Sequence, residues 1–407
     1  MDPDFSGVPA DTRTIPRDRL NIDNKARSNP FPWNGQFSPQ LIEALLDAHA
    51  PRGSFVLDPF LGGGTVLCEA ARLGHPGFGS EINPAAYKMA EVYRFINLKK
   101  HERKGPIEQA EELIYDALPD APLFPTGKRQ APIQESLPRT AAVAGSGLAK
   151  ILLDALVVLL DFGDEPLASD DVLRVWKRLR ATVVDLPYSE PIIDLVNRDA
   201  RALPLPDGAV DFVLTSPPYI NVFNYHQNYR RSVESLGWDL LKVARSEIGS
   251  NRKHRQNRFL TVTQYCLDMA SAFHELRRVC RPEARVVIVL GRESNVRKTS
   301  FFNGEIVARL ATRSCGCRLE SRQERVFQNR FGAMIHEDIL HFTFGTPTTD
   351  PPTATARQTL TEALSRAPRE SVADLKDAID RVEEVKPSPV YGDSAPQKTL
   401  RKPREAV

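Results

Sequence analysis

The feature that most constrains this chain is a short apolar run that ends at an aspartate and is followed by three consecutive glycines. The run 55–57 stops at Asp58, as a buried parallel strand does, and a helical pattern extends from about Thr65 to Leu73. Glycines at such a junction let the backbone pass close to a ligand, and they adopt positive φ where the turn requires it. These glycines form neither a G-x-G-x-x-G string nor a P-loop, because no lysine follows them. A dinucleotide or a triphosphate ligand is therefore disfavoured.

Strand and helix patterns alternate on both sides of this turn. A helix is expected over 37–50, a second strand over 77–81, and a helix over 84–96. Further strand patterns occur at 192–196, 210–215, 285–290 and 336–344. The alternation predicts an α/β fold with a doubly wound, mostly parallel sheet.

The remaining segments suggest how the chain is divided. Residues 1–28 are polar and punctuated by proline and arginine, so we expect an irregular N-terminal arm. The main domain is expected over 29–345, with a helical insertion at about 100–190 whose helix patterns lie near 106–118, 148–162 and 170–185. Proline is frequent after residue 346. We therefore expect a largely disordered tail over 346–407, apart from a helix at about 371–385.

The composition is that of a globular protein that neither crosses a membrane nor depends on disulfides. Hydrophobic residues make up 41% and charged residues 26% of the 407 residues, and the net charge is +2. No run approaches ~18 consecutive apolar residues, and the N-terminus lacks the apolar core of a secretory signal. Five cysteines, an odd number, do not indicate a disulfide framework. We expect a cytoplasmic protein with reduced thiols.

Two acidic residues at strand ends indicate which ligand the glycine turn would hold. Asp58 puts a negative charge where a cationic ligand can bind, and Glu81 ends the next strand, where a carboxylate commonly accepts hydrogen bonds from ribose hydroxyls. S-adenosylmethionine fits this combination, because it carries an ammonium, a sulfonium and a ribose diol but no phosphate. The alternative is a tight turn whose glycines serve packing, with Glu81 as a solvated strand end.

A second motif, Ser216-Pro217-Pro218-Tyr219, ends the strand pattern at 210–215. Prolines fix φ and donate no hydrogen bond, so the carbonyls of Ser216 and Pro217 can face an open site. The Ser216 hydroxyl and the Pro217 carbonyl can hold the N–H groups of an exocyclic base amine, with the nitrogen lone pair directed at a methyl donor. Tyr219 can stack on a base that has left the helix. The alternative is a strand-ending turn with a surface tyrosine.

Both strings resemble the signatures of the amino-methyltransferase superfamily, D-P-F-x-G-x-G-T for the cofactor and S/N/D-P-P-Y for catalysis. The serine form resembles the DNA cytosine-N4 methyltransferases more than the adenine-N6 enzymes. Segments 31–39 and 79–84 also resemble bacterial N4/N6 DNA methylases, and the resemblance covers about residues 28–98 and 190–345. It implies a Rossmann-like class I methyltransferase fold with S-adenosylmethionine as the cofactor.

The resemblance also implies roles for individual residues. The catalytic residues would be Ser216, Pro217, Pro218 and Tyr219, and the cofactor-binding residues would be Asp58, Phe60, Gly62, Gly64, Thr65, Glu81 and, near the adenine, Asp199. In two respects the chain departs from the family pattern. The cofactor signature precedes the catalytic one, and the insertion lies before Asp199. Both departures leave the place of target recognition open.

The segment 220–260, directly after the catalytic motif, is basic and interleaved with aromatic residues. Such a segment suits phosphate contacts and support for an extruded base. The candidates for contact with DNA are Arg230, Arg231, Arg252, Lys253 and Arg255. The alternative is a solvated charged surface.

Taken together, the motifs predict methyl transfer to N4 of cytosine in double-stranded DNA. The transfer is expected to be site-specific, as in restriction-modification, with a cognate restriction endonuclease as a further partner. The alternatives are N6 of adenine in DNA, a base amine in RNA, and a catalytically silent DNA-binding module. No metal site is expected, since Cys315-x-Cys317 has no second ligand pair, and no contact with a membrane is expected.

Overall fold

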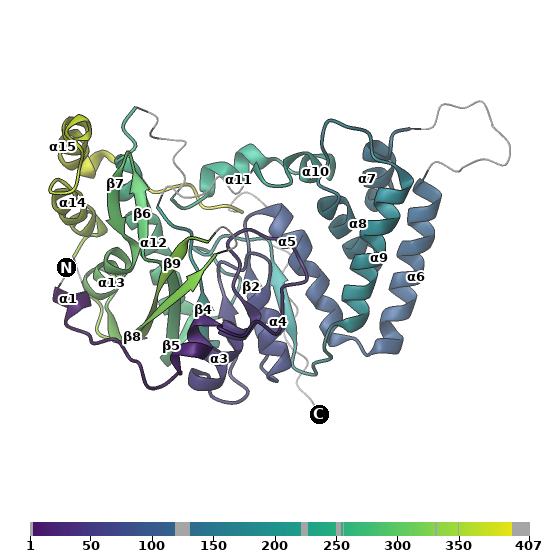
Figure 1. The fold of residues 1–407 in the computed structure, drawn as a ribbon, viewed down its shortest axis with the longest axis horizontal. Coiled ribbons are helices and arrows are strands. Elements are labelled where there is room, and N and C mark those ends of the chain that lie inside the picture. The colour runs from purple at the N-terminus through teal and green to yellow at the C-terminus, as the bar shows by residue number, and fades with distance from the viewer. Residues whose placement is uncertain are drawn as a thin grey trace.

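A seven-stranded sheet forms the centre of the protein (Figure 1). The computed structural model describes residues 3–118, 131–220, 227–249, 254, 256–329, 332–348 and 350–392. The strand order is β3-β2-β1-β4-β5-β9-β8, in which β1 to β5 are parallel and β9 is antiparallel to both of its neighbours. The strands are β1 (Val56–Asp58), β2 (Gly77–Ser80), β3 (Ile193–Val196), β4 (Val210–Thr215), β5 (Cys280–Gly291), β8 (Cys317–Gln328) and β9 (Met334–Phe344).

This order confirms the predicted doubly wound α/β fold. The chain winds outward from β1 to β3 in one direction and then continues on the other side of β1 with β4 and β5. In such a sheet, ligands bind outside the carboxyl ends of the strands where the winding direction reverses. Here that point lies between β1 and β4.

Helices cover both faces of the sheet because buried side chains alternate along the strands. On one face, Leu57 and Val213 pack with α12 (Leu260–Val279) and α13 (Asn303–Arg313). On the other face, Val56 and Phe212 pack with α3 (Pro39–His49) and α4 (Thr65–Arg72). Helix α5 (Pro84–Glu91) and the 3₁₀ helix η1 (Val92–Asn97) follow β2. The predicted helices over 37–50, 65–73 and 84–96 are thus present.

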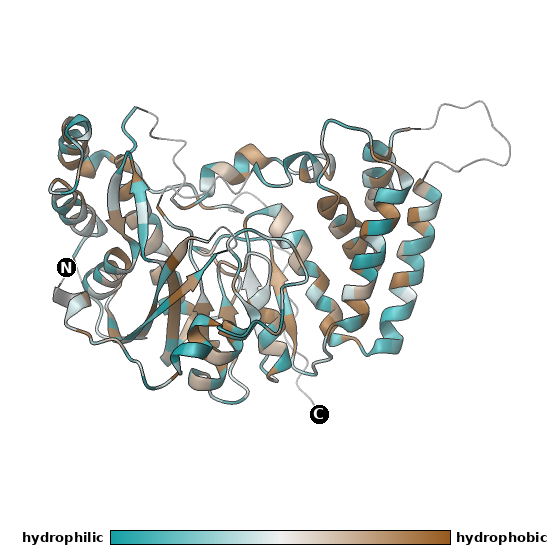
Figure 2. Cartoon of the chain, in the orientation of Figure 1, coloured by the Kyte–Doolittle hydropathy of each residue, from teal (hydrophilic) through white to brown (hydrophobic). Residues whose placement is uncertain are grey.

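The insertion between η1 and β3 is a helical bundle that stands beside the sheet (Figure 1). Its helices are α6 (Lys100–Ala117), α7 (Ile133–Val143), α8 (Leu148–Leu159) and α9 (Ser169–Asp185). Helix α8 is largely hydrophobic in Figure 2, and its Leu152, Leu153 and Leu156 are 0% exposed. Three of these helices match the predicted patterns. Helix α7 was not predicted, because Pro138 interrupts its pattern.

Arg103 of α6 holds the two ends of the insertion together. Its guanidinium donates to the carbonyls of Leu98, Val183, Leu186 and Pro187 at 2.7–2.9 Å, and the residue is 1% exposed. The chain therefore leaves the sheet and returns to it at one point.

The disordered tail expected over 346–407 is wrong for much of residues 352–392, and the helix expected at about 371–385 is present. These residues form α14 (Pro352–Ala363), η3 (Arg369–Ser371), α15 (Val372–Asp380) and η4 (Val382–Glu384). Leu360, Leu375 and Val382 are 0% exposed and join the core that contains α12 and α13. Pro352 stands at the first position of α14, where proline is tolerated, so the proline content does not prevent helix formation.

The sequence patterns also missed β8 and a small hairpin of β6 (Glu293–Val296) and β7 (Thr299–Phe302). The first 28 residues, expected to be irregular, contain the short helices α1 (Pro3–Ser6) and α2 (Arg17–Asn21). None of the described helices is both long and apolar enough to cross a membrane.

Candidate active site

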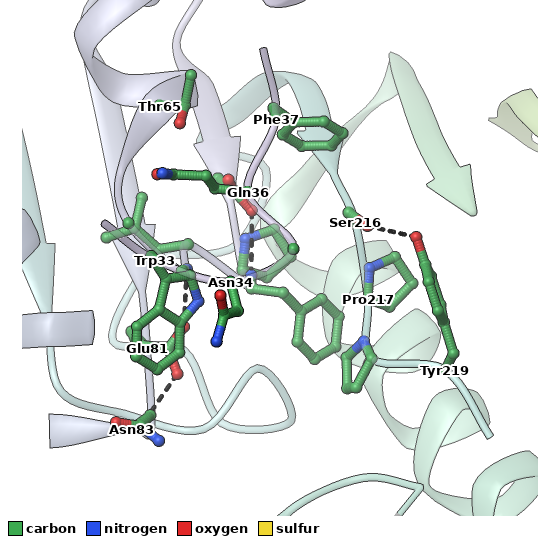
Figure 3. A pocket seen from close by; sticks show the side chains of 18 of the residues that line it. Trp33, Asn34, Gln36, Phe37, Thr65, Glu81, Asn83, Ser216, Pro217 and Tyr219 are labelled. Atoms are coloured by element: carbon green, nitrogen blue, oxygen red, sulfur yellow. Dashed lines mark hydrogen bonds between the residues drawn. The ribbon is translucent and has the colours of Figure 1, made fainter. Parts of the chain in front are cut away.

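A cavity of about 680 Å³ opens at the point where the winding of the sheet reverses. The carboxyl ends of β1, β2 and β4 contribute to it, together with the segment 33–37 and the β8–β9 hairpin (Figure 3). Its acidic lining residues are Asp58, Glu81, Asp199, Glu247 and Glu337, and none of the described lining residues is basic. Such a lining disfavours a phosphate and suits a cationic ligand.

Asp58 lies at the bottom of the cavity, where β1 and β4 end side by side. Its Oδ1 accepts hydrogen bonds from the Thr215 hydroxyl at 2.6 Å and from the Phe60 backbone N–H at 3.1 Å. The residue is 1% exposed, and burial raises the pKa of its carboxyl to about 7. A cation next to Asp58 would compensate for this desolvation.

Glu81 connects the end of β2 to the glycine turn. Its Oε2 accepts a hydrogen bond from the Gly62 N–H at 2.7 Å, and its Oε1 accepts one from the Asn83 N–H at 2.8 Å (Figure 3). Burial raises the pKa of this carboxyl to about 7. Each oxygen keeps capacity for a further hydrogen bond, as a ribose diol requires.

The glycine turn approaches the cavity at some positions but not at others. Gly62 has φ +52 and lines the cavity with Phe60 and Thr65. Gly64 has φ +84 and does not line it, and a Cβ at this position would lie 2.6 Å from the Tyr93 ring. The structure thus supports the packing alternative for Gly64. The Thr65 hydroxyl donates to Asn29 Oδ1 at 2.9 Å.

Asp199 lines the cavity, but its carboxylate is already saturated. Oδ1 accepts from the Arg201 N–H at 3.0 Å and from Arg201 Nε at 2.8 Å. Oδ2 accepts from Arg201 Nη2 at 2.7 Å and from the Tyr391 N–H at 3.0 Å. Since a carboxylate has about four acceptor sites, the side chain has none left for an adenine amine. The Asp199 carboxylate thus holds Arg201 and Tyr391 at the cavity wall, and its contact with the cofactor adenine stays a prediction.

The second motif also lines the cavity, directly after β4. Ser216, Pro217, Pro218 and Tyr219 all contribute to the wall, and the Ser216 and Tyr219 hydroxyls are 3.4 Å apart (Figure 3). The Tyr219 ring lies over Gly291 at the end of β5, where a Cβ would come within 3.0 Å of the ring. Both sequence motifs therefore line one cavity.

Two parts of the site were not predicted. Trp33, Asn34, Gln36 and Phe37 line the cavity (Figure 3), and Trp33 and Gln36 lie against Gly63 of the glycine turn. The Trp33 ring is stacked on that of Tyr229 at 6.3 Å between centroids. The proline and aromatic residues around position 33 are the signal that could have indicated this wall. Residues from β8 and β9 also line the cavity, but strand patterns carry no comparable signal for them.

Of the five basic residues expected to contact DNA, two lie in the described part of the chain. Arg230 pairs with Glu234 at 2.8 Å, and Arg231 pairs with Asp164 at 2.5 Å. Both arginines are about half exposed, with side-chain exposures of 45% and 52%. The other three, Arg252, Lys253 and Arg255, lie outside the described residues.

The five cysteines are free and buried. Among them, burial raises the pKa of Cys68 to about 11, so its thiol stays neutral near pH 7. In the part of the chain that the structure describes, no cluster of three or more histidine, cysteine, aspartate or glutamate side chains could hold a metal ion.

The sheet order is that of the class I methyltransferase fold. Residues 13–92 match the family model described as DNA methylase, which covers the first motif and the segment 33–37. In this region the chain is similar to the DNA amino-methyltransferases of the N6/N4 type.

Curated relatives agree with this match. The Type II methyltransferase M.MjaII of Methanocaldococcus jannaschii is 33% identical over 87 residues, which is 21% of this chain and 15% of that protein. The Type II methyltransferase M.BsoBI of Geobacillus stearothermophilus is 22% identical over 289 residues, which is 54% of each chain. The chain thus matches a sixth to about half of the length of these relatives.

Solved structures are more distant. A SAM-dependent methyltransferase from Methanosarcina mazei is 11% identical with a TM-score of 0.34, and the match covers 75% of this chain and 98% of that one. A putative RNA methyltransferase from Pyrococcus horikoshii is 13% identical with a TM-score of 0.33, covering 81% and 98%.

Proposed function

We propose that this protein transfers a methyl group from S-adenosylmethionine to the exocyclic N4 amine of cytosine in double-stranded DNA. The observation that supports this most is the single cavity shared by the acidic strand ends and the Ser216-Pro217-Pro218-Tyr219 loop. The match of residues 13–92 to the DNA methylase family supports DNA as the substrate.

The cavity residues fit the chemical groups of the cofactor. Asp58 would hold the ammonium, and Glu81 would accept hydrogen bonds from the ribose hydroxyls, while Gly62 leaves room for close backbone approach. The cofactor supplies an electrophilic methyl group on a sulfonium. None of the described lining residues is basic, so no positive side chain in the wall repels the sulfonium.

The catalytic loop would hold the target amine and the base. The Ser216 hydroxyl and the Pro217 carbonyl accept hydrogen bonds from the amine, which directs the nitrogen lone pair toward the methyl carbon. Tyr219 packs against a base that has left the duplex. The exposed Arg230 and Arg231 would contact phosphates, and a site-specific enzyme of this kind would act with a cognate restriction endonuclease.

Product analysis tests this proposal. The protein is incubated with cofactor labelled in the methyl group and with DNA or RNA, and the nucleic acid is then digested to nucleosides. We expect labelled N4-methylcytosine in DNA. Labelled N6-methyladenine would move the assignment to adenine, and label in RNA alone would move it to RNA. If the protein is folded and binds DNA but transfers no label, it is a catalytically silent DNA-binding module.

Cofactor affinity should depend on pH through the two buried carboxyls. Each has a pKa of about 7, so each is largely neutral at pH 6. Pairing with the ammonium requires the charged form of Asp58. The dissociation constant should therefore rise about 10-fold for each pH unit below 7 per coupled proton.

Calorimetry in buffers of different ionisation enthalpy checks this linkage. At pH 6 binding should release protons to the buffer, and this release should shrink as the pH is raised to 7.5. Cofactor binding that is equally tight at pH 6 and pH 8 would contradict the charge assignment at Asp58.

Replacing Tyr219 by alanine should reduce turnover while sparing cofactor binding. Loss of stacking on the extruded base removes ~1–3 kcal/mol, which corresponds to a loss of about 5- to 150-fold in kcat/KM. Tyr188→Ala is the matched control, because this tyrosine is 46% exposed and does not line the cavity. Equal kcat/KM in the two variants would contradict the stacking role.

A further inference from the structure

Glu337 is an acidic side chain in the cavity that neither sequence motif contains. It lies on β9 and lines the same cavity as Ser216 and Tyr219. Its position follows from the register of the sheet and not from a loop. The register also determines which groups surround the Glu337 side chain.

The register places three residues in one row across the sheet. Gly291 of β5 pairs directly with Glu337 of β9, and Glu337 pairs directly with Arg325 of β8. Directly paired residues project to the same face, and neighbouring strands are about 4.8 Å apart. Because the Tyr219 ring lies over Gly291, the Glu337 side chain is next to Tyr219 on that face.

Arg325 fixes the Glu337 carboxyl and favours its charged form against the effect of burial. Arg325 Nη1 donates to Glu337 Oε2 at 2.7 Å, and the two side chains are 7% and 16% exposed. The guanidinium carbon lies 4.0 Å from the centroid of the Phe327 ring, which restricts the arginine further. The second carboxylate oxygen of Glu337 has no such partner in the described part of the chain.

Ser216, the first residue of the catalytic motif, cannot stabilise a positive charge on the target amine in the way that a carboxylate can. Ser216 is neutral, so the motif carries no negative charge close to the amine. When the amine attacks, its nitrogen becomes positively charged before it loses a proton. A carboxylate beside Tyr219 stabilises that charge and can accept the proton.

We propose that Glu337 is the proton acceptor of the methyl-transfer reaction, with Arg325 as its positioning residue. This inference rests on the proposed function. The bond from nitrogen to the methyl carbon forms while the bond from sulfur to that carbon breaks, and the sulfonium becomes a neutral thioether. The proton of the resulting ammonium passes to the Glu337 carboxylate, which later releases it to water.

The reaction should accordingly depend on one carboxyl group even at saturating cofactor. Burial raises the pKa of Glu337 from its usual range, while Arg325 acts in the opposite direction. The other ionisable groups that face Glu337 or share its cavity are Tyr219, Arg325, Asp338, Asp58, Glu81, Asp199 and Glu247. Asp58 and Glu81 are expected to affect cofactor binding, so saturation separates their titration from that of Glu337.

Single-turnover methylation of DNA at saturating cofactor tests the inference. Glu337→Gln should reduce the rate about 100-fold or more and leave the dissociation constants of cofactor and DNA within twofold. The wild-type rate should fall below the pKa of the carboxyl, and this acid limb should be absent in the variant. Glu320→Gln is the control, because it makes the same change at a 40% exposed side chain on β8.

Glu337→Asp retains the carboxylate and provides a second variant. It should keep the acid limb of the pH profile at a reduced rate, which a purely structural ion pair would not explain. A wild-type rate that is independent of pH on the acid side overturns the inference, whether or not Glu337→Gln folds. An unchanged rate in Glu337→Gln also overturns it. If the wild-type protein methylates no DNA, the proposed function fails first, so the two failures are distinguishable.

Discussion

Replacing Arg201 by alanine should lower the free energy of unfolding by about 3–5 kcal/mol, because it removes the guanidinium that pairs with two buried carboxylates. The Arg201 side chain is 1% exposed and pairs with Asp199 at 2.7 Å and with Asp268 at 2.8 Å. It also donates to the carbonyls of Ser388 and Pro389 at 3.0 Å. The substitution therefore also removes two hydrogen bonds that hold the chain segment after η4.

Urea unfolding at constant pH measures this effect. Arg198→Ala is a suitable control, since Arg198 lies three residues away and donates to the Gly392 carbonyl at 2.8 Å from a partly exposed position. The control should lose less than about 1 kcal/mol. A similar loss of stability in both variants would contradict the role that we give to Arg201.

Glu81→Gln should weaken cofactor binding by about 100-fold or more. The carboxylate accepts from the Gly62 and Asn83 N–H groups, and an amide places an N–H donor against one of these donors. The substitution also removes the charge-assisted hydrogen bonds to the ribose, each worth about 1.5–3 kcal/mol. Loss of both would raise the dissociation constant by about 10²- to 10⁴-fold.

Titration calorimetry with S-adenosylmethionine provides the measurement, and circular dichroism verifies the fold. Glu112→Gln on the exposed side of α6 makes the same chemical change outside the site. Undiminished affinity in Glu81→Gln would show that the cofactor does not occupy this cavity in the proposed orientation. The result is independent of which base is methylated.

The central elements could be predicted from the sequence because they carry strong local patterns. The strand that ends in Asp58 and the one that ends at Thr215 are short apolar runs stopped by proline, and each run matches a strand of the sheet. The two motifs meet in space because parallel strands bring their carboxyl ends to one edge.

Other parts depend on contacts between distant residues and have no local signal. Glu337 reaches the cavity only through the pairing of β9 with β5, and the Asp199 carboxylate accepts a hydrogen bond from the distant Tyr391 N–H. The order of α14 and α15 depends on burial of Leu360 and Leu375 against a core that forms elsewhere in the chain. In each case tertiary packing decides the outcome, and composition does not.

Because Arg103 fixes both ends of the helical bundle, the amino-acid sequence of the bundle can change without moving the sheet. Four carbonyls from the two junctions are held by one side chain, so the strands on either side keep their places whatever the bundle's outer surface contains. Bundles of different sequence are then interchangeable at this point. The cavity at the centre of the molecule can keep its geometry while the outer surface of the bundle changes.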